Sequence, residues 1–304
     1  MTHRTHYTYS EAVAICQNQL RMQPRSSGRV VVHTSSVSIY PKPDNTFEHK
    51  DYFGNQVYSF AIESLHRELK VTASSNVSVE PIALPLATKQ NGESFFEGDM
   101  PWETVVEQSR TALTLPLRVL EYRFNSPRIT ASDVFASYAK KSFTPGRGLF
   151  AATEDLTRRI HDDFEYNTVL TDVNTPTEKS FGLRAGVCQD FAHIQIACLR
   201  SLGLPSRYVS GYLRTIPPAG TERMVGADES HAWLSVYAGK GHGWVACDPT
   251  NACFAGTQHI PICIGRDYGD VSPMRGVVLG GGTTSLRVNV DVEPIDAVVA
   301  ASGA

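Results

Sequence analysis

The chain has 304 residues, of which 41% are hydrophobic, so it can bury a sizeable core in two domains and is neither fibrous nor disordered. A formal net charge of −3 gives no electrostatic reason to expect nucleic acid or an anionic membrane as a partner. No apolar run reaches the roughly 20 residues that span a bilayer, and no signal-peptide core opens the chain. These features predict a cytoplasmic protein.

The first part of the chain predicts β-strands. Apolar and small polar residues alternate over residues 29–41, 56–64 and 68–81. The run DYFGNQ provides turn chemistry between two of these stretches. We therefore expect an N-terminal antiparallel β-sandwich-like domain over residues 1–85, whose simplest role is to brace the rest of the chain.

Helical signals follow a polar, glycine-containing stretch, which predicts a linker or helical connection over residues 86–128. Helical periodicity marks three stretches: residues 100–122 with a break at Pro116, residues 133–143 after a Thr130/Asp133 capping box, and residues 148–166. A further helix from Cys188 to Leu202 has almost no polar face and should be central and buried. Gly203 and Pro205 end it.

Strand patterns return after this helix. They cover residues 206–213, 231–238, 241–248, 274–280 and 285–294, and KGHG predicts a hairpin turn. The fold class is therefore α+β. We expect a second domain over residues 129–295, with its central helix packed on an antiparallel sheet, and a flexible tail over residues 296–304.

Cys188 differs from the other five cysteines by its place in the first turn of the buried helix. A helix N-terminus offers unpaired N–H groups and a partial positive charge, which favour the nucleophilic thiolate. His231 opens one predicted strand and Asp248 closes its hairpin neighbour. Pairing of these strands would bring a base and an orienting carboxylate to one sheet end, where the helix start can reach them.

Other polar residues have simpler interpretations. Cys198 and Cys247 are expected to be buried structural thiols, and Asp190 and His193 to be satisfied polar groups near the nucleophile. A metal site from Cys247, Cys253, Cys263 and His259 is disfavoured, because the cysteine spacings of six and ten residues match no usual zinc pattern. We therefore predict no metal and no cofactor. Without a C-x-x-C pair or a dense framework, the six cysteines should be reduced.

A family resemblance rests on three blocks: GVCQDFAH with Cys188, SHAW with His231 and VACDPTN with Asp248. Together they resemble the catalytic blocks of the transglutaminase-like superfamily of papain-like thiol enzymes. RYVSGYL, GRDYGDVSPMRGVVLGGG, HYTYSEAV and DYFGN are similar to its bacterial branch with an associated N-terminal β-domain. The resemblance covers nearly the whole chain, and residues 86–128 are its least distinctive part.

The resemblance implies a nucleophile at Cys188, a base at His231 and an orienting carboxylate at Asp248. The backbone N–H of Cys188 would be one oxyanion donor, and Tyr166 is our candidate for a second. These roles predict an amide hydrolase, a peptidase or amidase, that acts on peptide or protein substrates through a thioacyl intermediate. An acyltransferase that joins a carboxamide to an amine is the alternative, and a non-catalytic scaffold is a third. The oligomeric state stays open.

Overall fold

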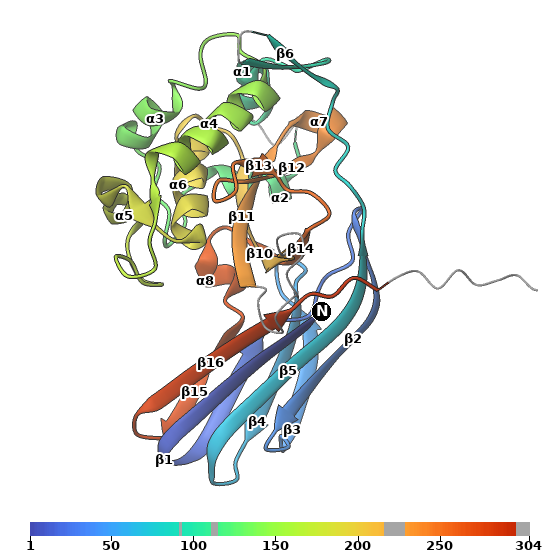
Figure 1. The fold of residues 1–304 in the computed structure, drawn as a ribbon, viewed down its shortest axis with the longest axis vertical. Helices are drawn as coiled ribbons and strands as arrows, with labels where there is room; N and C mark the ends of the chain where they lie inside the picture. The colour runs from blue at the N-terminus through green and yellow to red at the C-terminus, as the bar shows by residue number, and fades with distance from the viewer. Residues whose placement is uncertain (91–92, 111–114, 216–228, 296–304) are drawn as a thin grey trace, which may run out of the picture.

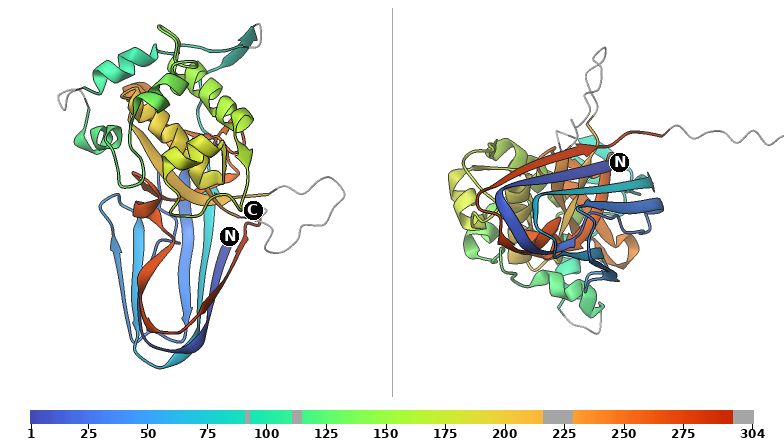
Figure 2. Two further views of the ribbon diagram at one scale, coloured as in Figure 1. Left: turned by 90° about the vertical axis from the view of Figure 1, so that its left-hand side faces the viewer. Right: turned by 90° about the horizontal axis from the view of Figure 1, so that it is seen from below.

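The computed structural model describes residues 1–90, 93–110, 115–215 and 229–295. It has two main parts (Figure 1). One part is a large sheet that no helix of the described residues covers, and the other is a second sheet that helices cover. The large antiparallel sheet has seven strands: β1 (Thr2–Leu20), β2 (Val30–Tyr40), β3 (Asn45–Lys50), β4 (Gln56–Ile62), β5 (His66–Val79), β15 (Met274–Gly280) and β16 (Thr284–Asp291). Seen from below, this sheet curls strongly (Figure 2).

Strand β1 organises the large sheet. Its first half pairs with β5 and β16, and its second half pairs with β4 and β15. Register shifts between Thr8 and Val13 and between Val13 and Ile15 separate the two halves, as expected where a long strand bends. The inner face packs a small core that includes Tyr9, Val13 and Leu69.

Strands β15 and β16 follow one another along β1, so they join the N-terminal strands rather than the second sheet. Thr2 pairs with Asp291 and Leu20 pairs with Met274. The sequence places these strands correctly, but the predicted second domain over residues 129–295 included them. The large sheet thus draws strands from both ends of the chain, and residues 1–85 do not complete it.

The second sheet has five antiparallel strands in the order β13-β12-β11-β10-β14. Their bounds are β10 (Ser206–Leu213), β11 (Glu229–Tyr237), β12 (Trp244–Asp248), β13 (Cys253–Phe254) and β14 (His259–Gly265). The predicted KGHG turn is a single helical turn, α7 (Gly239–His242), because Gly239 and Gly243 both take positive φ and close it.

Helices cover one face of this five-stranded sheet (Figures 1 and 2). They are α3 (Asp133–Ala139), α4 (Leu149–Asp163), α5 (Thr177–Leu183) and α6 (Cys188–Ser201), and the short α8 (Tyr268–Val271) follows β14. Helix α6 is almost wholly buried against β11 and β10, which confirms the predicted central helix on an antiparallel sheet. The cap of α3 is Ser132 rather than Thr130.

The connection between the two parts contains short elements. They are β6 (Ala87–Gln90), β7 (Glu93–Phe96), α1 (Trp102–Gln108), α2 (Leu117–Leu120) and the 3-10 turn η1 (Glu121–Arg123). Two further strands, β8 (Glu165–Tyr166) and β9 (Ala185–Gly186), form a small parallel pair ahead of α6. The predicted tail over residues 296–304 lies outside the described residues.

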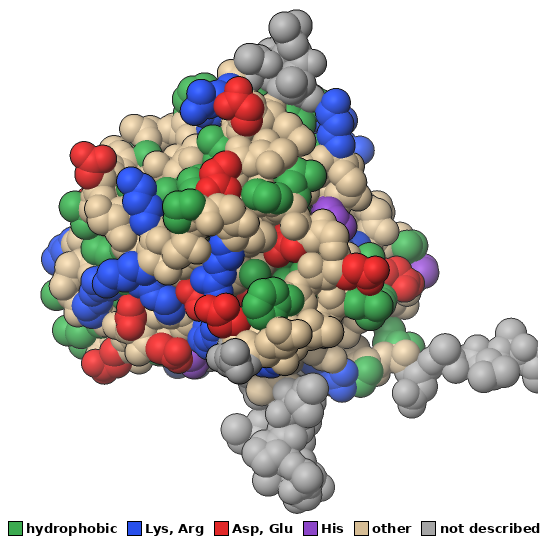
Figure 3. Space-filling model, turned by 90° about the horizontal axis from the view of Figure 1, so that it is seen from above, with side chains coloured by type: hydrophobic (Ala, Val, Ile, Leu, Met, Phe, Trp, Pro, Cys, Tyr) green, Lys and Arg blue, Asp and Glu red, His purple; other side chains and the backbone are tan. Residues whose placement is uncertain are grey.

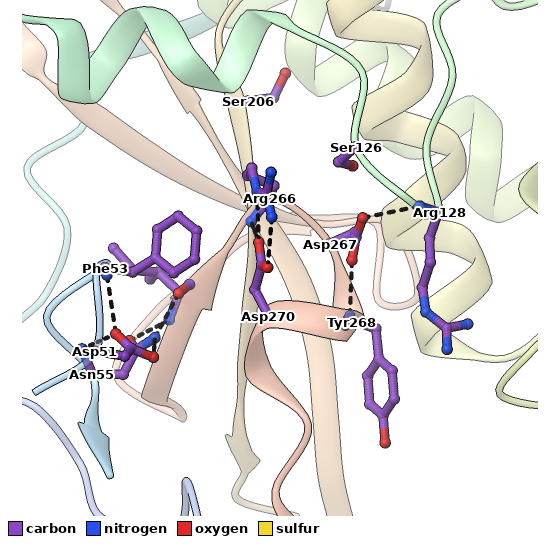
Figure 4. Close-up of polar contacts among 12 residues, drawn as sticks. Asp51, Phe53, Asn55, Ser126, Arg128, Ser206, Arg266, Asp267, Tyr268 and Asp270 are labelled. Carbon is purple, nitrogen blue, oxygen red and sulfur yellow. Dashed lines mark hydrogen bonds and ion pairs between the residues drawn. The ribbon is translucent and has the colours of Figure 1, made fainter. Parts of the chain in front are cut away.

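A polar network joins the two parts (Figure 4). Asp51 accepts hydrogen bonds from the backbone of Phe53 and Asn55 and so closes the turn between β3 and β4. The Asn55 side chain then pairs with both backbone groups of Ile264 on β14, at 2.8 and 2.9 Å. The DYFGN run therefore does more than fix strand register, because its last residue fastens the large sheet to the second one.

The surface seen from above carries Lys and Arg beside Asp and Glu, with hydrophobic side chains scattered among them (Figure 3). Charges of the two signs are thus interspersed on this face. Within the described ranges, no helix combines the length and the apolar character that crossing a membrane requires.

Candidate active site

Cys188 is the first residue of α6, and the preceding segment holds it there. Gly186, which lies two residues before the thiol, pairs with Tyr166 across β9 and β8. Asp190 accepts hydrogen bonds from the Val187 backbone N–H, Thr171 and Ser180, at 2.7 to 2.9 Å. A Cβ at Gly186 would lie 2.5 Å from an Asp190 oxygen, so only glycine fits there. Asp190 is thus a fully satisfied group that fixes the approach to the thiol.

His231 and Asp248 meet at one end of the second sheet. His231 Nε2 lies 2.7 Å from Asp248 Oδ2, and both side chains are buried. A carboxylate can only accept here, so Nε2 carries the hydrogen and Nδ1 is the nitrogen left for Cys188. Cys188 is partly exposed, and its interaction with His231 raises the pKa of that imidazole. The imidazole and the carboxylate are therefore in direct contact, and the thiol influences the same imidazole.

The carboxylate of Asp248 accepts five hydrogen bonds. Its Oδ1 accepts from the backbone N–H groups of Thr250 and Asn251, which closes the turn at Pro249. Its Oδ2 accepts from His231, His259 and the Asn251 side chain, at 2.7, 2.9 and 2.7 Å. Asp248 is therefore both a turn former and the anchor of the imidazole, with one oxygen for each task.

The electrostatics follow from these contacts. Burial lowers the pKa of His231, but hydrogen bonds to Asp248 and Cys188 and the coulombic attraction of both groups raise it to about 10. Burial raises the pKa of Asp248, but the hydrogen bonds from His231, His259 and Asn251 outweigh it and hold the pKa below the usual range. At neutral pH, His231 is an imidazolium beside the thiol, which is the partner that a thiolate needs.

The sequence does not predict that His259 and Asn251 contact Asp248. His259 on β14 donates Nε2–H to Asp248 and accepts at Nδ1 from the Gly256 backbone N–H, so both ring nitrogens are engaged. Asn251 covers Asp248 from the same turn. The DPTN block contains Asn251, but its side-chain direction is not a sequence signal, and His259 reaches Asp248 only because the chain crosses the sheet end between β13 and β14.

Gly211 leaves room for the side chains that pack around His231 and His259. It pairs with His231 across β10 and β11. A Cβ at Gly211 would lie 2.4 Å from the Trp233 ring and 2.3 Å from the Ile260 carbonyl oxygen. Trp233 therefore fills the space beside the strand and contacts the His259 ring at a centroid distance of 5.2 Å. The RYVSGYL block thus supports the site without taking part in it.

Tyr166 is 47% exposed and packs edge-on against Phe191, with ring centroids 6.3 Å apart. Its strand pairing places its backbone beside Gly186, close in sequence to the thiol. As the first residue of α6, Cys188 has an N–H group without an intrahelical partner. Both donors stay predictions for the oxyanion role.

Metal-binding side chains come together at one place in the described chain, His231, Asp248 and His259, whose ligand atoms lie within 4.8 Å of one another. The disfavoured set of Cys247, Cys253 and Cys263 with His259 does not assemble among these residues. Both imidazole Nε2 atoms point at the same carboxylate oxygen at hydrogen-bond length. Each nitrogen therefore carries a proton, whereas a metal ligand must be deprotonated.

At pH 6, iodoacetamide should alkylate Cys188 well before the other five cysteines. Burial raises the pKa of Cys16, Cys198, Cys247, Cys253 and Cys263, which leaves these thiols protonated. Cys253 is the matched comparison, since it is also partly exposed. Peptide mapping by mass spectrometry after short exposures measures the rates, with unfolded protein as the control. Equal labelling of all six in the folded protein would refute this assignment.

Two family models match the chain. The Bacterial transglutaminase-like N-terminal region matches residues 1–78, and the Transglutaminase-like superfamily matches residues 137–249, which include Cys188, His231 and Asp248. An uncharacterized protein of Mycobacterium tuberculosis is 37% identical over 305 residues, 97% of this chain and 92% of the relative. One of Mycobacterium leprae is 32% identical over 292 residues, 96% and 97% of the two chains.

A solved structure described as a putative cysteine protease from Cytophaga hutchinsonii has the same fold. Its TM-score is 0.67 at 18% identity, with 97% of this chain and 92% of that chain covered. The helix start, sheet and polar trio therefore define a papain-like fold with a cysteine, histidine and aspartate site. The chain belongs to the transglutaminase-like superfamily, as its sequence blocks predict.

Proposed function

We propose that this protein is a cysteine-dependent amide hydrolase, a peptidase or amidase, that acts on a peptide or protein amide. The observation that carries the proposal is the His231–Asp248 contact at the end of the second sheet, with Cys188 at the start of α6 acting on the same imidazole. The superfamily includes cysteine-dependent peptidases and acyltransferases, which is consistent with chemistry at a thiol. The description of the Cytophaga hutchinsonii protein as a putative protease agrees with the hydrolytic choice.

In the first half of the reaction, the Cys188 sulfur attacks the amide carbonyl carbon. The carbonyl oxygen gains negative charge and accepts a hydrogen bond from the Cys188 backbone N–H, with Tyr166 as the proposed second donor. When the tetrahedral intermediate collapses, the C–N bond breaks and His231 Nδ1 gives its proton to the leaving amine. The products are a free amine and a thioester on Cys188.

In the second half, water attacks the thioester. His231, now neutral, accepts a proton from the water as it forms the new C–O bond. The C–S bond then breaks, the acid leaves, and the thiolate and the imidazolium are restored. Asp248 keeps Nε2 protonated throughout, so Nδ1 serves as acid in one step and as base in the next.

An acyltransferase would share every step up to the thioester and would then use an amine in place of water. Hydrolysis is preferred because Cys188 is partly exposed and water can reach the thioester. The proposed cytoplasmic location rests on the six free thiols, which suit a reducing compartment.

Incubation with glutamine-containing peptides, with and without a fluorescent primary amine, tests the proposal. Mass spectrometry should find shortened peptides or a free acid, with no amine adduct. The adduct as the main product would instead establish acyl transfer. Peptides left intact by the wild type over a broad donor set would favour the scaffold interpretation. The Cys188→Ala variant serves as the blank in every arm.

A further inference from the structure

A second cavity lies behind the candidate active site, on the face of the five-stranded sheet opposite α6. Alternate residues of β10, β11 and β12 form its floor, and the segment of residues 25–29 after β1 forms its other wall. Its volume is about 430 Å³. The cavity therefore sits between the two parts of the molecule, and its walls come from both.

The charge of this cavity is one-sided. Arg25, Arg29 and Arg207 all line it, and none of its described lining residues is Asp or Glu. Across the part of the chain that the structure describes, none of these three guanidinium groups forms an ion pair with a carboxylate. This contrasts with the mixed charges of the surface in Figure 3. Three cations thus share a small space without an anion.

Arg207 is the centre of this arrangement. Its guanidinium stacks over the Trp244 ring at 4.2 Å, and its buried Nε has no hydrogen-bond partner among the described residues. Burial lowers the pKa of Arg207 to about 10. The positive charge of Arg25 also lowers this pKa, whereas Tyr122 raises it. A buried donor on a charged group costs stability unless an acceptor meets it.

Arg25 and Arg29 keep donors available to the cavity. Arg25 donates to the Phe53 carbonyl at 2.6 Å, while Arg29 donates to the Glu80 carbonyl at 3.0 Å. Neutral carbonyl oxygens satisfy single N–H groups but do not neutralise the charge. Trp233 and Trp244 supply flat apolar walls beside these groups. Planar guanidinium forks next to aromatic faces suit a carboxylate or phosphate on a small, flat body.

We propose that this cavity binds a small organic oxyanion through Arg207, Arg25 and Arg29. The site is separate from Cys188, and its occupancy does not depend on the proposed hydrolase activity. It nevertheless borders the candidate active site, because His259 lines the cavity and also donates to Asp248.

Benzoate, its neutral isostere benzamide, and inorganic phosphate are the probes. Two of the three tryptophans of the chain, Trp233 and Trp244, line the cavity, so their fluorescence reports binding directly. Benzoate or phosphate should bind saturably at millimolar concentration, with affinity that falls as salt rises, and benzamide should not. Benzamide binding as well as benzoate would show an apolar pocket only and would overturn the proposal, as would the absence of saturable binding by both anions.

Arg207→Gln should weaken anion binding by about tenfold or more, as loss of a charge-assisted hydrogen bond predicts. Arg25→Gln is the second variant, in case Arg207→Gln does not fold by circular dichroism. Arg118→Gln is the matched control, because Arg118 is exposed and lines the neighbouring cavity but not this one. Equal affinity in the Arg207 or Arg25 variant and the Arg118 variant would overturn the assignment.

Discussion

Replacement of Cys188 by alanine is expected to reduce amide turnover by roughly a thousandfold or more. The thiol is the attacking group, and its neighbours can only assist it. The side chain is small and partly exposed, so its loss should leave the fold intact. Turnover is measured on the substrates identified in the peptide assay, and folding by thermal unfolding.

Cys253→Ala is the control for that experiment. Cys253 is also free and partly exposed, and it pairs with Asp248 through the backbone of β13 and β12. Its variant should keep wild-type turnover. If Cys188→Ala is as active as the wild type, or if both variants lose activity equally, the nucleophile lies elsewhere.

The Asp248→Asn variant should lower kcat by roughly a hundredfold to ten-thousandfold with little change in KM. The amide has one oxygen, whereas the carboxylate uses Oδ1 for the turn and Oδ2 for the imidazoles. If the amide oxygen keeps the turn, its NH2 faces Nε2 of His231. The imidazole must then place its hydrogen on Nδ1, which is the nitrogen that has to accept a proton from water.

The pH profile gives this prediction a second readout. In the wild type, hydrogen bonds to Asp248 and Cys188 raise the pKa of His231 to about 10 against the effect of burial, so the imidazolium persists into alkaline solution. Loss of the carboxylate charge lowers that pKa. The alkaline limb of kcat/KM should therefore move to lower pH. An unmoved limb would mean that Asp248 only supports the turn.

Asp267→Asn is the matched control for Asp248→Asn. Asp267 is equally buried, and it accepts hydrogen bonds from the backbone of Arg128 and Gly269 near α8. Its variant should lose stability without the shift in the pH profile. A similar shift in both variants would point to general destabilisation rather than to an effect on His231.

The sequence can single out the three residues of the trio because each has a local signal. Cys188 lies at a helix start, two residues after Gly186. His231 and Asp248 lie on strands joined by a short turn, so local pairing brings them together. His259 has no such signal. Its contact with Asp248 depends on the strand order, in which β14 lies beside β10 and on the opposite side of β11 from β12. Only the complete sheet reveals that contact.

The fold shows the same limit. Alternation predicts β2, β4, β5, β15 and β16, but it does not state which strands pair. Proximity along the chain favoured placing residues 274–291 with the second sheet, and pairing with β1 overrides it. Strand β1 itself has a pattern interrupted by polar residues and a bend, so its length of 19 residues was not predicted.

The pairing of β1 with β15 and β16 has a consequence for synthesis of the chain. During translation, β1 leaves the ribosome first, but two of its four partner strands are made last. One long edge of β1 therefore stays open while everything between is produced, and closing it joins segments separated by nearly the whole chain. We expect slow completion of this sheet, with association between nascent chains as its main hazard until β15 and β16 arrive.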